Sequence, residues 1–297
     1  MYKIANMERK RMPYYRKARS LMRYALRSYT NDLVERLKKC STAQQMRVEA
    51  DKVVKSDNIA LAMRGIYTDT GQYFAKETIK VLKKQKALDP SMRGNLTDDY
   101  WLNYMEQVFR SKLANRIKWI TGTTEEIFKE TVRNITEQGL QEGLSVYHMT
   151  EQIRKELNIT EVYRAERISR TEVAAASNEA SVAGAESVGM ELNKVWISYI
   201  DDRTREDHIE LDGKVVGFDE DFMPGLPYPC AIGGSPDQVI NCRCTIGYEE
   251  KDNTITIGRF ERHSNKISYR GCKGCRQEQA DSYRLLFYVH TRTGFRQ

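Results

Sequence analysis

The sequence predicts an α+β protein, in which a mainly helical N-terminal two-thirds is followed by a small β-rich module. Apolar residues recur at helical spacing through about the first 190 residues, and strand-like alternation begins after Gly189. Four of the six prolines then fall within one loop, MPGLPYPCAIGGSPD. No apolar run reaches the roughly 18 residues that a membrane span requires, and the first residues lack the apolar stretch of a signal peptide. We therefore expect folding in the cytosol with reduced cysteines.

The first helices are predicted from the spacing of apolar residues. One stripe recurs at every fourth position: Leu21, Ala25, Tyr29, Leu33 and Leu37. Residues 59–81 and 101–120 repeat the pattern. Thr123 and Glu126 match a capping box, which predicts that a new helix starts there and ends near Gly139.

A long Ala-rich helix is predicted over residues 160–188, after a short helix over 146–158. Small side chains along the long helix would let another helix approach closely; they are Ala174, Ala175, Ala176, Ser177, Ala180, Ala183 and Gly184. Gly189 is the expected C-cap, because glycine readily adopts the left-handed conformation that ends a helix.

Short strands are expected beyond Gly189, the first two separated by the turn signal Asp212-Gly213. The candidate segments are residues 195–199, 214–216, 239–246, 254–257 and 285–289. Together these patterns divide the chain into a basic helical region (1–95), a helical region ending in the Ala-rich helix (96–192), a compact α+β module (193–251) and a basic tail (252–297).

The positive charge of the chain is concentrated at its two ends. Residues 1–40 carry 12 Lys or Arg against 3 Asp or Glu, and residues 252–297 carry 9 against 4, although the net charge of the whole chain is only +7. This distribution suggests that the ends bind DNA phosphates or an acidic protein surface, the alternative being a solvated helix face. The candidate partner-binding residues are Arg9, Lys10, Arg11, Arg16, Lys17, Arg19, Arg23 and Arg27.

Cysteine and histidine residues of the module form a candidate zinc site. Cys242 and Cys244 are two apart, so on a strand both side chains would leave the same face. His208, together with Cys230 or with one of Asp201 and Asp202, could complete a tetrahedral site. The alternative is that the cysteines are small buried side chains beside a hydrogen-bonded histidine.

A second pair, Cys272 and Cys275, has the Cys-x-x-Cys spacing of a metal knuckle within basic surroundings. It could bind nucleic acid, or it could join Cys242 and Cys244 in a four-cysteine site. Redox chemistry is disfavoured because no βαβ pattern surrounds the pair.

Several enzyme classes are disfavoured by missing residues. His208-Ile-Glu210 followed by Pro229-Cys230 approaches the zinc deaminase signature, but Gly233 stands where that signature requires cysteine. No phosphate-binding GxxxxGK[ST] loop is present, and no G-x-S-x-G elbow occurs in a strand-turn-helix setting. A His-Asn-His nuclease would need a second histidine in the module.

The order of motifs resembles the phage Mu protein F family, the minor head or head-morphogenesis proteins of tailed bacteriophages. An Arg-Thr-Glu helix precedes a strand with Trp196, an Asp-x-x-x-Arg-x-x-His-x-x-Leu-Asp-Gly segment and Ile-Asn-Cys-Arg-Cys, over about residues 125–250. The motif residues besides the candidate ligands are Arg167, Arg170, Glu172, Asp202, Arg205, Asp212, Gly213 and Asn241. We expect Arg167, Arg170 and Glu172 to anchor their helix to the Cys-x-Cys module through charge-assisted hydrogen bonds.

The resemblance implies a non-catalytic virion component, present in few copies in the capsid interior or at the portal vertex. It implies a role in head morphogenesis or DNA delivery, with the portal, other head proteins and packaged double-stranded DNA as partners. Some homologues carry ADP-ribosyltransferase domains beyond this module, and no matching motif is seen here. The alternative is a metal-dependent nuclease or hydrolase acting on DNA, with His208, Asp202 and Cys242 near its site.

Overall fold

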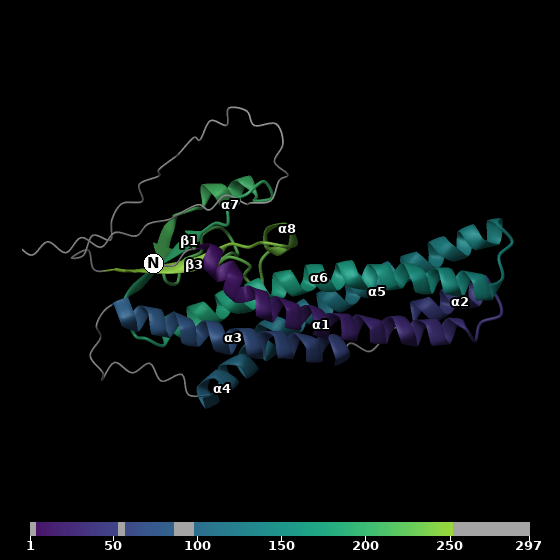
Figure 1. Cartoon of the computed structure of the whole chain (residues 1–297), viewed down its shortest axis with the longest axis horizontal. Helices are drawn as coiled ribbons and strands as arrows, with labels where there is room; N and C mark the ends of the chain where they lie inside the picture. The colour runs from purple at the N-terminus through teal and green to yellow at the C-terminus, as the bar shows by residue number, and fades with distance from the viewer. Residues whose placement is uncertain (1–3, 53–56, 86–97, 252–297) are drawn as a thin grey trace, which may run out of the picture.

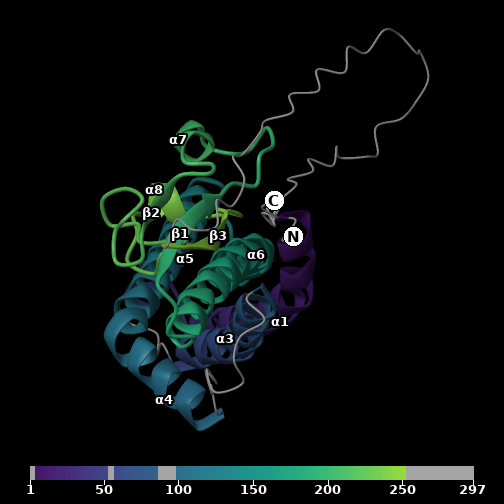
Figure 2. The same ribbon diagram turned by 90° about the vertical axis from the view of Figure 1, so that its left-hand side faces the viewer.

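An elongated bundle of long helices carries a small sheet at one end, as Figure 1 shows. This computed structural model describes residues 4–52, 57–85 and 98–251. The sheet lies where the first helix begins and the longest helix ends (Figures 1 and 2). The predicted α+β class, mainly helical and then β-rich, is confirmed. Among the described residues, no helix has the length and apolarity needed to span a bilayer.

The bundle begins with three helices. They are α1 (Ile4–Leu37), α2 (Ala43–Asp51) and α3 (Asp57–Gln85). The predicted apolar stripe of α1 faces the core, with Tyr29 and Leu37 almost completely buried. Thr42 caps α2 by accepting a hydrogen bond from the Gln45 backbone N–H, which satisfies one of the unpaired donors of the first turn.

The predicted helix start at Thr123 is wrong. Helix α4 (Asp98–Val108) continues through a π-helical turn, η1 (Phe109–Leu113), into α5 (Ala114–Gln141). Instead of capping a new helix, the Thr123 hydroxyl donates to the Trp119 carbonyl, and the Thr124 hydroxyl donates to the Ile120 carbonyl, one turn back. Threonine satisfied in this way is tolerated inside a helix, so the sequence pattern did not mark a boundary.

The predicted break near Asn158 is also wrong, because α6 (Val146–Glu186) is one continuous helix. Buried Ile153, Leu157 and Ala165 keep the same face of α6 against the bundle on both sides of Asn158. Packing therefore overrides the weak helix propensity of the Asn-Ile-Thr sequence. The expected C-cap is displaced: Ser187 caps α6, and Gly189 follows it two residues later in the left-handed conformation, with φ +67°.

The module contains a three-stranded antiparallel sheet of order β2-β1-β3. Its strands are β1 (Leu192–Ile197), β2 (Val215–Gly217) and β3 (Thr245–Glu250), and two short helices, α7 (Glu206–Glu210) and α8 (Pro236–Val239), lie between them. The third predicted strand starts later than expected, because residues 236–239 are helical and the two cysteines precede β3. The candidate strands at 254–257 and 285–289 lie outside the described residues.

The apolar core is continuous between the bundle and the module. Trp196 and Phe222 of the module are fully buried, and their rings pack edge to face with centroids 5.3 Å apart. They belong to the same cluster of buried residues as Leu37 and Leu157 in the helices. The module therefore completes its core with the helical bundle and with the Cys/His cluster described next.

Candidate metal centre and its supports

Three predicted ligands meet inside the module. His208 comes from α7, whereas Cys242 and Cys244 come from the segment between α8 and β3. Their ligand atoms all lie within 4.8 Å of one another, and each sulfur is 3.6 Å from His208 Nδ1. None of the three residues is more than 4% exposed. Sulfur and imidazole nitrogen at these positions are the ligand types that zinc prefers.

A hydrogen-bond chain orients the His208 ring. Its Nε2 lies 2.8 Å from Gln238 Oε1, and the Gln238 amide in turn donates to Asp207 Oδ2 at 2.7 Å. Because the amide oxygen only accepts, the proton belongs on Nε2, and Nδ1 keeps its lone pair toward the two sulfurs. Such a partner on the second nitrogen is typical of metal-binding histidines.

The two thiols are held in their neutral form by their surroundings. The hydrogen bond with the Cys230 thiol, followed by burial, raises the pKa of Cys242. The Cys242 thiol and burial raise the pKa of Cys244 in the same way. A bound cation would reverse this effect, because it stabilises the thiolates that serve as ligands.

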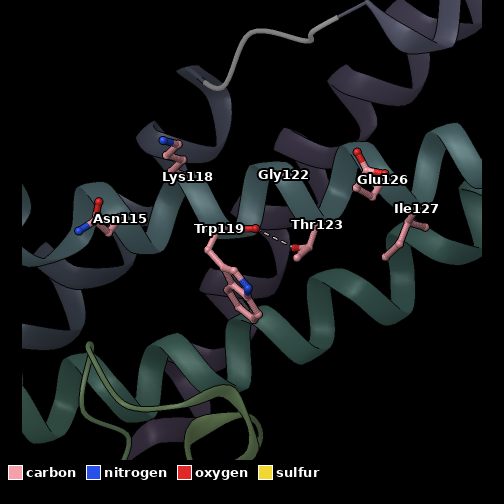
Figure 3. A pocket seen from close by; sticks show the side chains of 7 residues that line it. All are labelled: Asn115, Lys118, Trp119, Gly122, Thr123, Glu126 and Ile127. Carbon is pink, nitrogen blue, oxygen red and sulfur yellow. Dashed lines mark hydrogen bonds between the residues drawn. The ribbon is translucent and has the colours of Figure 1, made fainter. Parts of the chain in front are cut away.

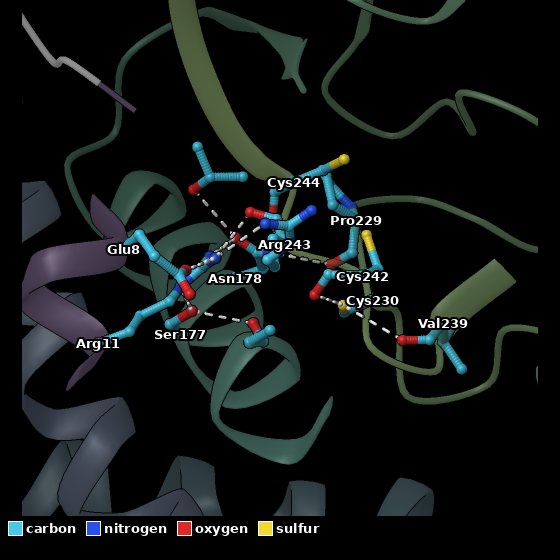
Figure 4. Close-up of polar contacts among 12 residues, drawn as sticks. Glu8, Arg11, Ser177, Asn178, Pro229, Cys230, Val239, Cys242, Arg243 and Cys244 are labelled. Carbon is cyan, nitrogen blue, oxygen red and sulfur yellow. Dashed lines mark hydrogen bonds and ion pairs between the residues drawn. The ribbon is translucent and has the colours of Figure 1, made fainter. Parts of the chain in front are cut away.

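Cys230 does not belong to the group of three ligands. Its backbone has φ +61°, and its thiol is directed to the carbonyls of Val239 and Cys242, at 3.6 and 3.3 Å (Figure 4). The aspartates considered as alternative ligands are engaged or exposed. Asp201 pairs with Arg243, which lowers the pKa of its carboxyl, and Asp202 is exposed.

Arg11 fastens the start of α1 to the metal segment, although the sequence suggested that it binds a partner. Only 4% exposed, its guanidinium donates to Ser177 Oγ at 2.8 Å and Asn178 Oδ1 at 3.0 Å on α6. It also donates to the backbone carbonyls of Arg243 and Cys244, at 3.1 and 3.4 Å (Figure 4). Arg11 is therefore an internal connector and not part of a binding surface.

Asn178 is a second connector that sequence reasoning missed. Its amide donates to the carbonyls of Pro229 and Cys244, at 2.7 and 3.2 Å, while its oxygen accepts from Arg11. A buried asparagine inside an Ala-rich helix was the available signal, because such a polar group requires partners.

Several motif residues shape the backbone around the centre. Arg205 donates to the Ile240 carbonyl at 2.8 Å, and Asp212 accepts from the Ser198 backbone N–H at 2.8 Å. Gly213 and Asn241 have φ +79° and +57°, conformations that favour glycine and asparagine. The sequence motif is thus largely explained by turns and backbone contacts.

The expected anchoring by Arg167, Arg170 and Glu172 is wrong. Glu172 instead accepts from Arg116 Nε on α5 and from the Tyr67 hydroxyl on α3, both at 2.9 Å. Arg170 pairs with Glu166 on its own helix at 2.9 Å, and Arg167 is exposed. The contact of this part of α6 with the module comes from Thr171, whose hydroxyl accepts from the Asn241 N–H at 3.0 Å.

Apart from Arg11, the candidate partner-binding residues of α1 fall into two groups. Lys10, Lys17 and Arg27 pair with Glu77, Asp69 and Glu161 of neighbouring helices. The remaining four form no ion pair with any residue that the structure describes; they are Arg9, Arg16, Arg19 and Arg23. Only this second group, mostly exposed, remains a candidate partner-binding set. Cys272 and Cys275 lie outside the described residues.

These contacts define a class of protein in which a small sheet module, centred on a buried His/Cys cluster, is docked on a long helical bundle. Residues 130–247 match the family described as Phage Mu protein F like protein. The match covers the end of α5, all of α6 and nearly all of the module. This segment therefore belongs to the phage Mu protein F-like family, as its motifs predicted.

Three curated proteins are similar to parts of this chain. The NAD(+)–arginine ADP-ribosyltransferase EFV of Enterococcus faecalis is 28% identical over 66% of this chain and 39% of its own length. Minor head protein GP7 of Bacillus phage SPP1 is 28% identical over 40% of this chain and 41% of its own. The uncharacterized protein YqbB of Bacillus subtilis is 26% identical over 58% of this chain and 57% of its own length.

The chain thus spans less than two thirds of each of these relatives. No solved structure matches it significantly.

Proposed function

We propose that this protein is a minor head protein of a tailed bacteriophage, acting without catalysis in head morphogenesis and in DNA delivery at the portal. The observation that carries the proposal is the family match over α6 and the module. The similarity to a minor head protein of a Bacillus phage supports the same role. Within the matched segment, the motif side chains mainly hold helices and turns together, as expected of a structural component.

We further propose that His208, Cys242 and Cys244 hold one structural zinc ion. The mixed nitrogen and sulfur donor set, the buried location and the oriented His208 ring support this assignment. Zinc would join α7 to the segment before β3 in a module with a small apolar core of its own. The three residues leave the fourth ligand unassigned, and Cys272 and Cys275 remain candidates for it.

A metal-dependent nuclease or hydrolase is the second candidate, and one observation favours it. Three protein ligands with a free fourth position are the pattern of catalytic zinc sites. Burial argues against this reading, because a substrate must reach the metal and all three ligands are almost inaccessible. Asp202, which this alternative places near the site, is exposed and does not join the cluster.

The proposed partners are the portal, other head proteins and packaged duplex DNA. Helices α1 and α6 run antiparallel, as the contacts Arg27–Glu161 and Arg170–Tyr15 indicate. Arg16, Arg19 and Arg23 lie between these two contacts on α1, and Arg164 and Arg167 lie between them on α6, so both helices carry arginines along the same stretch. Such a surface suits either DNA phosphates or an acidic protein face.

Salt dependence separates these two kinds of partner. If the surface contacts DNA, the affinity of the full chain for duplex DNA falls steeply with salt, with a slope of about 0.9 per phosphate contacted. Replacing Arg9, Arg16, Arg19 and Arg23 by glutamine then reduces that slope. If no binding occurs even at low salt, the surface binds a head protein instead.

Mass spectrometry of purified heads tests the head-protein role. Heads of the encoding phage, analysed before and after DNA ejection, are expected to contain this chain at a few copies per particle. Loss of the chain on ejection would identify it as a delivered protein. Its absence from assembled heads, despite its presence in the infected cell, would contradict the proposal.

A further inference from the structure

An arginine-lined hollow lies between α5, α6 and the segment before β3. Its volume is about 220 Å³, and its walls include Arg116, Arg164, Arg167, Trp119 and Ile240. Pockets for drug-sized ligands generally measure about 300 Å³ or more, so this hollow fits one small chemical group and not a nucleotide.

The hollow carries positive charge that the described residues do not neutralise. Its single carboxylate, Glu172, already pairs with Arg116 at 2.9 Å. Arg164 and Arg167 form no ion pair with the described residues. Burial, together with the neighbouring Arg167, lowers the pKa of Arg164 to about 10, which reflects the cost of a cation without a counter-charge.

Arg164 is held in place by hydrogen bonds that use only part of its N–H donors. Its Nε donates to Thr124 at 2.8 Å, and its Nη2 donates to the Ile120 carbonyl and the Thr123 hydroxyl, at 3.0 and 2.5 Å. These bonds leave both N–H groups of Nη1 for a ligand. A guanidinium fixed before binding loses little entropy when an anion arrives.

The rim of the hollow is apolar. Trp119 is 39% exposed and also lines a wider, shallow depression with Gly122 and Ile127, where its ring extends from α5 toward α6 (Figure 3). Lys118 and Glu126 flank that depression. Exposed tryptophan beside arginine is the composition that dominates protein–protein interfaces.

We propose that the hollow binds the carboxylate of an acidic side chain, presented by an apolar segment of a partner protein that covers Trp119. The Arg167 guanidinium can bind a carboxylate in planar, two-point geometry, and Arg164 Nη1 can donate to the same carboxylate. The indole would pack against the apolar neighbours of the acid. Duplex DNA fits less well, because it presents phosphates on a polar, convex backbone. Residues 252–297 of this chain are also a poor match, because their net charge is positive: they carry 9 Lys or Arg against 4 Asp or Glu.

A matched pair of peptides tests the proposal on the full-length protein. The probes are N-acetyl-Leu-Glu-Phe-amide and the same peptide with glutamine in place of glutamate, so only the charge differs. The readout is the indole N–H signal of Trp119 in nitrogen–proton correlation spectra, identified by its loss in Trp119→Phe. The other two tryptophans are buried, so this signal reports the hollow.

The glutamate peptide is expected to shift the Trp119 signal saturably, with a dissociation constant of about 1 mM. The glutamine peptide is expected to bind about tenfold more weakly, and Arg167→Ala to weaken the glutamate peptide by a similar factor. Arg154→Ala is the control, because Arg154 is an exposed arginine of α6 that pairs with Glu151 away from the hollow.

Three outcomes would overturn the proposal. They are equal binding of the two peptides, no shift at about ten times the expected dissociation constant, and a stronger shift dependent on Arg167 with duplex DNA or inorganic phosphate. The last would assign the hollow to phosphate. The experiment involves no phage particle, so its failure would leave the head-protein proposal standing.

Discussion

At the scale of single residues, Glu172 connects three helices through its two carboxylate oxygens. One oxygen accepts from Arg116 on α5 and the other from the Tyr67 hydroxyl on α3. Glu172 and both of its partners are buried, so each polar group depends on the others for hydrogen bonds. The Arg-Thr-Glu motif therefore owes its glutamate to the junction of α3, α5 and α6.

Replacing Glu172 by glutamine should destabilise the protein by about 3–5 kcal/mol, because buried Arg116 loses its counter-charge. The matched control is Glu166→Gln, which removes a more exposed ion pair with Arg170 and should cost no more than about 1 kcal/mol. Urea unfolding measures both. Equal stability of the two variants would show that the Glu172 pair contributes nothing particular.

Asp201 makes stability depend on acid. The Arg243 guanidinium donates to its carboxylate and lowers the pKa of Asp201 in the folded state below the unfolded value of about 3.9. The unfolded state therefore takes up the proton first, so this contribution is full above about pH 4 and is lost as pH falls through the folded pKa. Asp201→Asn should flatten the decline of the unfolding midpoint below pH 4. An unchanged decline would assign the acid sensitivity to other carboxylates.

The candidate ligands could be predicted from the sequence, whereas their supports could not. Cys-x-Cys spacing and a nearby histidine are local signals, and the structure brings those three residues together. Arg11 meets Ser177, 166 positions later, and no local pattern indicates such a contact. Basic residues near a chain end resemble a binding surface until the packing of α1 on α6 is known.

At the scale of helices, α3 and α6 approach each other closely at one glycine. A Cβ atom on Gly184 would lie 2.7 Å from the Ala75 carbonyl oxygen. The sequence predicted that the small residues of this helix would admit a neighbour, and the structure identifies α3 as that neighbour. Helix ends were predicted less well, because Thr123 and Asn158 have partners or packing that carry the helix past them.

Two Gly→Ala substitutions should therefore have opposite effects. Gly184→Ala should lower the free energy of unfolding by about 1–3 kcal/mol, since the backbone of α3 must move. Gly122→Ala should raise it by about 0.5–1 kcal/mol, because no atom lies within 4 Å of the added Cβ and alanine favours the helix. Thermal unfolding of both variants checks this. Stabilisation by Gly184→Ala would mean that α3 and α6 pack more loosely.

At the scale of the whole molecule, Arg11 joins the first helix to the backbone of Arg243 and Cys244, more than 230 positions later in the chain. Arg11→Lys should cost about 1.5–3 kcal/mol, because lysine cannot reproduce the fork of bonds to Asn178 and to the carbonyls before β3. Hydrogen exchange should accelerate in residues 242–246 and in the first turns of α1. Arg16→Lys, at an exposed position, is the control. Equal exchange rates of these residues in Arg11→Lys and Arg16→Lys would refute the connection.

The zinc content of the purified full-length protein tests the metal centre most directly. We expect about one equivalent of zinc, lost in Cys242→Ser and kept in His148→Ala, which alters an exposed histidine of α6. Removing the metal with a chelator should unfold residues 193–251 while the helices remain. Less than about a tenth of an equivalent in the unaltered protein, with the module still folded, would contradict a zinc-stabilised module.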